Sequence, residues 1–358
     1  MGSIRTVALA GPIRPTEGPF PTVSGDVVPT QPPLSQPQSP GIREPAPATP
    51  LVQYVSQTID LRGKSLDQQT AFFSQLLSRT DGPRTISVEL LSAGDPAVHQ
   101  LTIQAIDGAR RMRPGSRIRF EALLSGMKPG ARTCRMLGIS AEQTAVHNAD
   151  LRVTASPVIQ KRALAAISRI SRSPAFDKIA IDDHALFTAA DLNELSKVSG
   201  QTVPQLQTLS LTNLTALVAT IKRFGKTPTM SVGGVSFTQS ATGLSNAAFI
   251  RRIGLANGIY EVQLYTENNA SLSKALRSLM SEARADPSAF GSLAGLRVAL
   301  AATANHTKIG PRQLRDQQKM VAEFARDFFE NTGVKVSTAL WDGTRYLSQM
   351  KGSQEAMR

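Results

Sequence analysis

The sequence is poor in the residues that many functional sites require. Cys134 is the only cysteine among 358 residues, and the four histidines show no HExxH or CxxC spacing. A disulfide framework is therefore excluded, and we expect neither a metal site nor a cofactor. Aromatic residues make up only 5% of the chain, which argues against nucleic-acid binding by base stacking on aromatic platforms.

Long apolar runs are also absent. No stretch of 18 apolar residues could span a bilayer, and the N-terminus has no continuous apolar segment of the signal-peptide type. We expect no transmembrane segment and a cytoplasmic protein. The alternative is secretion into a host cell, because a proline-rich tail beside a basic body is typical of some bacterial proteins of that kind.

Positive charge is in excess, with a formal net charge of +13. Residues 1–50 are balanced in charge, so the excess belongs to the remainder of the chain, and it is densest over residues 110–135. Such a run is usually a solvated face of a basic protein. The alternative is a nucleic-acid or anion patch that includes Arg110, Arg111, Arg113 and Arg132.

The N-terminal 50 residues hold 12 of the 22 prolines and show no apolar periodicity. Segments of this composition bury too little apolar surface to offset the loss of chain entropy, so residues 1–50 are predicted to form a disordered tail. The chain begins Met-Gly-Ser-Ile-Arg-Thr, which fits the pattern for myristoylation of Gly2 in a suitable host.

Strands and helices alternate after the tail. The apolar patterns predict strands at 58–62, 86–90 and 118–122, with helices at 67–77 and 96–109 between them. Strands joined through helices in this order form right-handed crossovers, which indicates an α/β fold with a parallel sheet.

Five short motifs occur in an order known from one family. They are Leu61-Arg-Gly63, Leu91-Ser-Ala-Gly-Asp95, Ala145-Val-His-Asn-Ala-Asp150, Ser199-Gly-Gln-Thr202 and Phe224-Gly225. In order and spacing, residues 57–233 resemble the Clp-type serine peptidases of the Clp/crotonase superfamily. The resemblance implies a ββα spiral around a parallel sheet, and rings or stacked oligomers by self-association.

The same resemblance implies where a catalytic triad would stand. The only nucleophile that remains near the family's serine is Ser125, while the histidine position falls on Thr154 and the aspartate position on Asn213. Gly94 remains in the turn that would hold the oxyanion, but Asp95 beside it would repel developing negative charge. His184 could replace the base, although a surface role is the simpler interpretation.

Residues 234–350 repeat the alternation of strands and helices predicted for residues 57–233. An alternating pattern at 235–237, a helix at 244–253, a strand at 259–264 and a helix at 272–285 follow one another, and a strand at 296–301 comes next. This suggests a second α/β unit as a degenerate tandem copy, as in tandem signal-peptide peptidases. A single elaborated domain is the alternative.

The leading hypothesis is a catalytically degenerate Clp-like protein that acts by binding or oligomeric assembly, with a protein partner in addition to self-association. One alternative is an active serine peptidase or hydrolase that uses Ser125 with a non-standard base. Another is a basic protein that binds nucleic acid, or an effector protein secreted into a host.

Overall fold

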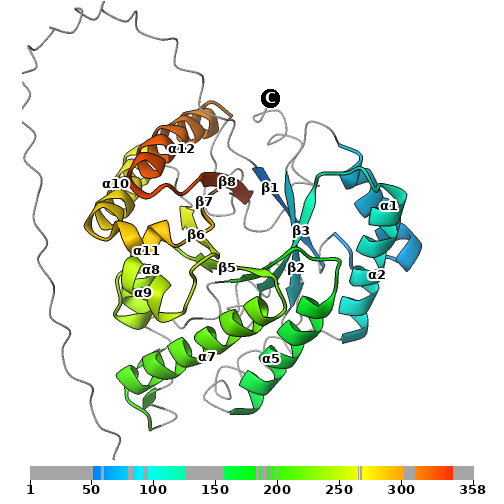
Figure 1. Ribbon diagram of the computed structural model, residues 1–358, viewed down its shortest axis with the longest axis horizontal. Helices are drawn as coiled ribbons and strands as arrows, with labels where there is room; N and C mark the ends of the chain where they lie inside the picture. Colours follow the sequence, from blue (N-terminus) through cyan, green and yellow to red (C-terminus); the bar gives the residue numbers. More distant parts are fainter. Residues whose placement is uncertain are drawn as a thin grey trace, which may run out of the picture. The chain divides into compact units, whose positions relative to one another are not determined.

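The described strands close into a parallel barrel. The computed structural model describes residues 51–57, 60–79, 84–91, 96–125, 157–182, 186, 192–193, 196–197, 200–264, 266, 268–301 and 311–341. Its strands pair in chain order, and the last pairs with the first (Figure 1). They are β1 (Leu51–Ser56), β2 (Thr85–Leu91), β3 (Arg119–Ser125), β4 (Lys178–Ile181), β5 (Thr227–Val232), β6 (Ile259–Leu264), β7 (Gly295–Ala301) and β8 (Val336–Trp341).

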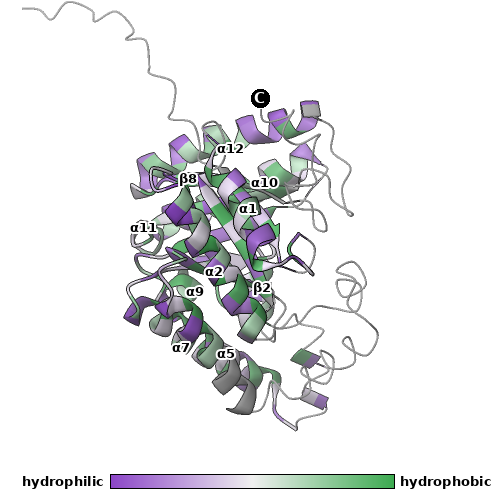
Figure 2. Cartoon of the chain, turned by 90° about the vertical axis from the view of Figure 1, so that its right-hand side faces the viewer, coloured by the Kyte–Doolittle hydropathy of each residue, from purple (hydrophilic) through white to green (hydrophobic). Residues whose placement is uncertain are grey.

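Helices surround the barrel on its outside. They are α1 (Leu66–Leu77), α2 (Pro96–Met112), α5 (Pro157–Arg172), α7 (Val203–Arg223), α8 (Phe237–Thr242), α9 (Asn246–Arg252), α10 (Asn269–Ala285), α11 (Pro287–Gly291) and α12 (Pro311–Thr332). In Figure 1, α1 and α2 cover one side of the barrel and α8 to α12 cover the opposite side. Figure 2 shows hydrophilic and hydrophobic residues interspersed on these outer helices, as their amphipathic sequences require.

The main core lies between the strands and the helices. Strand residues of one parity are apolar and fully buried, such as Ile86 and Val88 on β2 and Phe120 on β3. Capping boxes at Ser65 and Thr202 fix the starts of α1 and α7, because each side chain accepts a backbone N–H of the first turn. These signals explain why the amphipathic segments form helices that pack on a barrel.

Strand residues of the other parity point to the barrel axis, and many of them are polar. Ser87, Glu121, Thr229, Glu261 and Arg297 are all buried although they carry polar or charged groups. A small apolar cluster completes the interior: Val52, Tyr54, Leu123, Ala180, Ala299 and Ala339. The interior is therefore a packed core with polar side chains built into it, as in other (β/α)₈ barrels, and not a pore.

Most predicted elements that fall on described residues are found close to their expected positions. The helix expected at 67–77 is α1, the strand expected at 86–90 is β2, and the strand expected at 259–264 is β6. The strand expected at 58–62 is wrong, since β1 ends at Ser56 and residues 60–62 turn toward α1. Phe237, expected in an alternating strand, begins α8 instead.

The expected ββα spiral is wrong, and so is its tandem repetition. β4 pairs with β5 and β5 pairs with β6, so one sheet continues across the boundary expected at residues 233 and 234. β8 then pairs with β1 and closes the barrel. Eight consecutive strands thus share one barrel. The tail at 1–50, including Gly2, lies outside the described residues.

Helices long and apolar enough to cross a membrane are absent from the part of the chain that the structure describes.

Candidate functional site

The carboxyl ends of the strands form one end of the barrel, where (β/α)₈ enzymes hold their active sites. Buried or half-buried polar side chains meet there from several strands. Among the described residues they are Gln57 after β1, Glu89 in β2, Asp182 after β4, Ser231 in β5 and Gln263 in β6. We call this end the mouth.

Asp182 is a carboxylate of the mouth that both its backbone and its side chain connect to other strands. It directly follows β4, and its backbone N–H donates to the carbonyl of Leu124 at 3.3 Å, which extends the β3–β4 pairing by one residue. Its side chain accepts a hydrogen bond from Nε2 of Gln263 at 3.4 Å. Asp182 is 7% exposed, so the residue is largely buried at the mouth.

A chain of hydrogen bonds leads from Asp182 into the barrel. Gln263 also donates to Oγ of Ser231 at 2.8 Å, and Ser231 donates to Oε1 of Glu261 at 2.6 Å. Nη1 of Arg297 then donates to Oε2 of Glu261 at 2.9 Å. The carboxylate at the mouth is thus connected, through two neutral side chains, to a buried ion pair.

Arg297 bridges two buried glutamates near the middle of the barrel. Its guanidinium donates to both carboxylate oxygens of Glu121 at 2.9 and 3.0 Å, in addition to Glu261. Hydroxyl groups of Ser87 and Thr229 donate to Glu121, and Tyr54 donates to Glu261. Few polar atoms in this cluster lack a partner, which is the condition under which a buried charge is tolerated.

The cluster determines the charge state of its members. Burial alone would raise the pKa of Glu121, but the charge and hydrogen bonds of Arg297 outweigh it and lower that pKa below its ordinary value. Burial would likewise lower the pKa of Arg297, yet Glu121 and Glu261 raise it. Burial and the carboxylate of Glu261 raise the pKa of Tyr54. Arg297 and Glu121 are therefore charged and Tyr54 neutral near pH 7.

The rim beside β1 is fixed by short hydrogen bonds. Oδ2 of Asp60 accepts the N–H of Ser56 at 2.9 Å and closes the turn that follows β1. The side-chain amide of Gln57 donates to Thr102 on α2 at 2.8 Å, and its backbone N–H donates to the carbonyl of Glu89 at 3.1 Å. Glu89 is 6% exposed, which makes it a second carboxylate at the mouth, two strands from Asp182.

A cavity of about 630 Å³, with hydroxyl and amide residues and also apolar residues in its lining, adjoins the mouth between α8 and α10. Gln263 and Thr266 line it at the strand ends, and Lys274 and Glu282 line it along α10. Glu282 is occupied by a structural role, since it accepts the backbone N–H and the side-chain amide of Asn246 at the start of α9. Gln263 therefore joins the cavity to Asp182.

The residues expected at a degenerate triad lie in different parts of the protein. Ser125 is the last residue of the barrel strand β3 and pairs with Leu91. Asn213 lies on α7, a helix of the outer layer that packs against α5. Thr154, the turn residue Gly94 and the substitute base His184 lie outside the described residues.

The arginines of the expected anion patch have different surroundings. Arg110 forms an ion pair with Asp177 at 2.7 Å and lies over the ring of Phe120. Nε of Arg113 donates to Ser74 at 3.4 Å. Arg111 is exposed on the last turn of α2, whereas Arg132 lies outside the described residues.

From the sequence alone, the simple interpretation of Asp182 is an N-cap ahead of a helix expected from residue 185. The sequence does carry a signal for the role it has here: in Lys178-Ile-Ala-Ile-Asp182 a carboxylate follows a short apolar run. In a parallel α/β barrel, polar residues at the ends of strands are candidates for function. Without the barrel the same residue is only a plausible N-cap, so recognising it depends on the fold.

No group of three His, Cys, Asp or Glu side chains among the described residues is arranged to hold a metal ion.

Comparisons with known proteins give likeness in fold but not in sequence. No protein-family model and no curated protein matches the sequence. Among solved structures, the chain is similar to the PgaB (BpsB) glycoside hydrolase domain from Bordetella bronchiseptica, with a TM-score of 0.52, 12% identity and coverage of 87% of this chain and 98% of that one. It is also similar to the endo-β-1,4-mannanase from Thermotoga petrophila, with a TM-score of 0.52, 8% identity and coverage of 82% and 68%.

The interpretation as a degenerate Clp-type peptidase is therefore wrong, together with its alternative of an active serine peptidase of that fold, whereas nucleic-acid binding did not depend on that fold and stays a prediction. The peptidase interpretation depended on a ββα spiral, and the chain instead folds as a closed eight-stranded barrel similar to solved glycoside hydrolases. Of the motifs that carried the resemblance, Leu61-Arg-Gly63 lies between β1 and α1 and Phe224-Gly225 lies between α7 and β5, whereas Ala145–Asp150 lies outside the described residues.

Proposed function

We propose that the protein is a carbohydrate-active enzyme that cleaves glycosidic bonds at the mouth of its barrel. The observation that carries the proposal is Asp182, a carboxylate at the carboxyl end of a barrel strand that is oriented by Gln263 beside the cavity. Likeness in fold to two glycoside hydrolases supports the choice of reaction. Below 25% identity that likeness concerns the fold alone, so the residues must carry the chemistry.

Glycoside hydrolysis needs a carboxylic acid that protonates the leaving oxygen and a second carboxylate that acts as nucleophile or base. Asp182 is our candidate for one of these roles. Glu89, on the same end of the barrel, is the described candidate for the other. Gln263 would act as a positioning residue, because its amide holds Asp182 on one side and Ser231 on the other.

The cavity beside the mouth fits a sugar in its chemistry. Its described lining is dominated by hydroxyl and amide side chains, including Ser236, Gln239, Ser271 and Gln263. Such groups can donate to and accept from sugar hydroxyls, and a cavity of about 630 Å³ lies within the usual range for small-molecule sites.

The proposal is tested by measuring reducing-sugar release from a panel of polysaccharides that includes mannan. We expect the wild-type protein to hydrolyse at least one of them, and Asp182→Asn to lower kcat by about 10²-fold or more. Asp327→Asn is the matched control, because Asp327 is exposed on α12 and forms only a surface ion pair with its neighbour Arg326. Equal activity of Asp182→Asn and wild type would contradict the proposal.

A further inference from the structure

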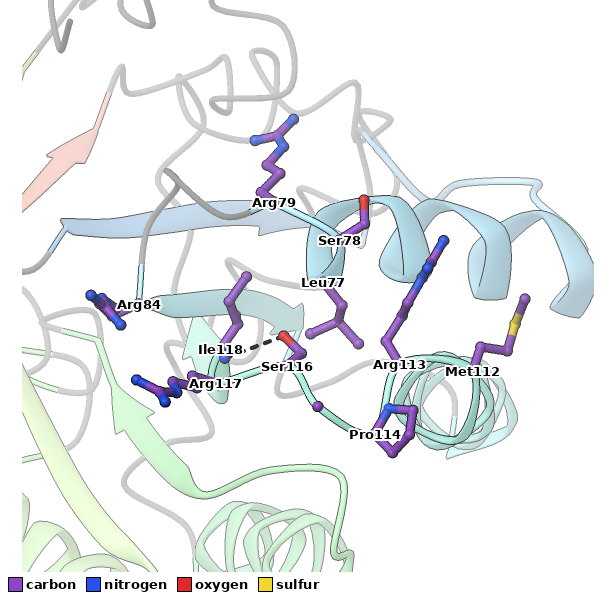
Figure 3. A pocket seen from close by; sticks show the side chains of 11 residues that line it. Leu77, Ser78, Arg79, Arg84, Met112, Arg113, Pro114, Ser116, Arg117 and Ile118 are labelled. Carbon is purple, nitrogen blue, oxygen red and sulfur yellow. Dashed lines mark hydrogen bonds between the residues drawn. The ribbon is translucent and has the colours of Figure 1, made fainter.

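A second cavity, of about 590 Å³, opens at the opposite end of the barrel from Asp182. It lies where α1 leads into β2 and α2 leads into β3 (Figure 3). Arg79, Arg84, Arg113 and Arg117 line it, and no carboxylate belongs to its described lining. We call it the arginine pocket.

Arg84 and Arg117 are placed together by the pairing of two strands. Thr85 is the register partner of Arg119, and the N–H of Arg119 donates to the carbonyl of Arg84 at 3.0 Å. Arg84 and Arg117 thus lie just before the first residues of neighbouring parallel strands. Their side chains are exposed and form no hydrogen bond or ion pair with other residues in the described part of the chain. Each guanidinium keeps its five N–H donors for a ligand.

The other two arginines are partly engaged. Nη1 of Arg79 donates to Gln53 at 3.1 Å and Nε of Arg113 donates to Ser74 at 3.4 Å. Both lie within two residues of a helix end, and the negative end of a helix dipole attracts cations. The helix dipole therefore accounts for the presence of Arg79 and Arg113 at these positions. It does not account for Arg84 and Arg117, because they precede strands.

An apolar wall accompanies the charges. Leu77, Met112, Pro114 and Ile118 line the same cavity. Met112 is 61% exposed, the highest value among the large hydrophobic side chains that the structure leaves exposed. Methionine is common at adaptable binding surfaces because its flexible thioether fits varied shapes. The pocket therefore offers cationic donors and an apolar surface side by side.

We propose that the arginine pocket binds a small organic diphosphate. Its phosphates would be held by Arg84 and Arg117, whose side chains lie on one side of the pocket in Figure 3, and its organic part would extend across Leu77 and Ile118 toward Met112 on the other side. Guanidinium groups match phosphate oxygens in bidentate geometry. The volume suits a drug-sized ligand and exceeds what inorganic phosphate would fill. The site is separate from the mouth and does not depend on the proposed hydrolase activity.

The probe is ADP, titrated calorimetrically into the full chain at constant ionic strength. We expect saturable binding that is at least about tenfold weaker in the double variant Arg84→Gln/Arg117→Gln, since each charge-assisted contact is worth more than a neutral one. Arg252→Gln is the matched control: Arg252 is also exposed, but it lies on α9, across the barrel from α1 and α2 (Figure 1). No binding of ADP at millimolar concentration would overturn the proposal, as would equal weakening by Arg252→Gln.

Two further probes separate the charged part of the pocket from its apolar wall. Pyrophosphate should bind in competition with ADP and more weakly, whereas adenosine should not bind. Met112→Ala should weaken ADP several-fold and leave pyrophosphate unchanged. If adenosine binds as well as ADP, or if the arginine variants leave pyrophosphate unaffected, the assignment of phosphates to Arg84 and Arg117 fails.

Discussion

The two ends of the barrel differ in charge although the same strands build both. At the carboxyl ends, the carboxylates Glu89 and Asp182 lie among neutral amides such as Gln263. At the amino ends, Arg84 and Arg117 lie in a cavity whose described lining has no carboxylate. Between them, Arg297 forms ion pairs with two buried glutamates. Among the described residues the two ends thus present opposite charges, which suits different ligands.

The largest loss of stability should come from disrupting the buried ion pairs of Arg297 with Glu121 and Glu261, which form a layer between the two ends of the barrel. Arg297→Met leaves Glu121 and Glu261 buried without their cation. Removing one partner of a buried pair costs about 3–5 kcal/mol, and we expect this loss in the free energy of unfolding measured with urea. The triple variant Arg297→Met/Glu121→Gln/Glu261→Gln should recover part of it. A loss below about 1 kcal/mol in the single variant would show that the glutamates accept protons or water instead.

Acid should weaken the same layer. Arg297 lowers the pKa of Glu121 in the folded protein below the ordinary glutamate value of 4.5. A carboxyl group whose pKa is lower in the folded than in the unfolded protein stabilises the fold. This stabilisation is complete at pH values above the unfolded-state pKa and is lost as the pH falls through the folded-state pKa. Urea midpoints should therefore decline increasingly steeply below pH 4.5. Glu121→Gln, although less stable at pH 7, should show a shallower decline, and an unchanged slope would exclude this glutamate as the cause.

Smaller effects on stability and kcat should distinguish the role of the mouth from that of the ion-pair layer beneath it. Ser231→Ala removes the hydroxyl that links Gln263 to Glu261, and Thr229→Val removes a similar hydroxyl bonded to Glu121. Each should cost about 1 kcal/mol of stability. Only Ser231→Ala should also lower kcat, by up to about tenfold, because only that hydroxyl helps to position Asp182 through Gln263. A common loss of kcat in both variants would indicate a general loosening of the barrel.

The smallest effect on folding is expected at the amino end. Arg84→Gln/Arg117→Gln should change the free energy of unfolding by less than about 0.5 kcal/mol, because both side chains are exposed and unpaired among the described residues. A thermal melt without ligand measures this. Marked destabilisation would mean that these arginines hold the fold together and are not kept free for a ligand.

The sequence predicted many elements but not how they join. Helical spacing found α1 and α10, and apolar alternation found β2 and β6, because these signals are local. β1 was missed: its apolar residues Leu51, Val52, Tyr54 and Val55 form only a short run, and they directly follow the proline-rich tail. Because β1 is the strand that pairs with β8, the elements found in the sequence did not indicate that the sheet closes into a barrel.

The polar interior also misled interpretation of the strands. Ser87, Glu89 and Glu121 alternate with apolar residues, a pattern that usually indicates one solvated face. In the structure these residues face the barrel axis and are buried. The long-range contacts that compensate them, such as Arg297 with Glu121, join residues 176 positions apart, and no local pattern reveals such a pair. The site at Asp182 was out of reach for the same reason.

The ion pairs of Arg297 have a consequence for any attempt to divide the protein into half-barrels. A fragment carrying β1 to β4 would retain Glu121 without its cation, whereas a fragment carrying β5 to β8 would retain Arg297 with one of its two anions. The first fragment would expose an uncompensated carboxylate on the surface where the halves meet, and the second would expose a guanidinium whose donors to Glu121 have lost their acceptor. We infer that the halves fold in mutual dependence, and that two separately expressed halves would recognise each other through this pair of opposite charges.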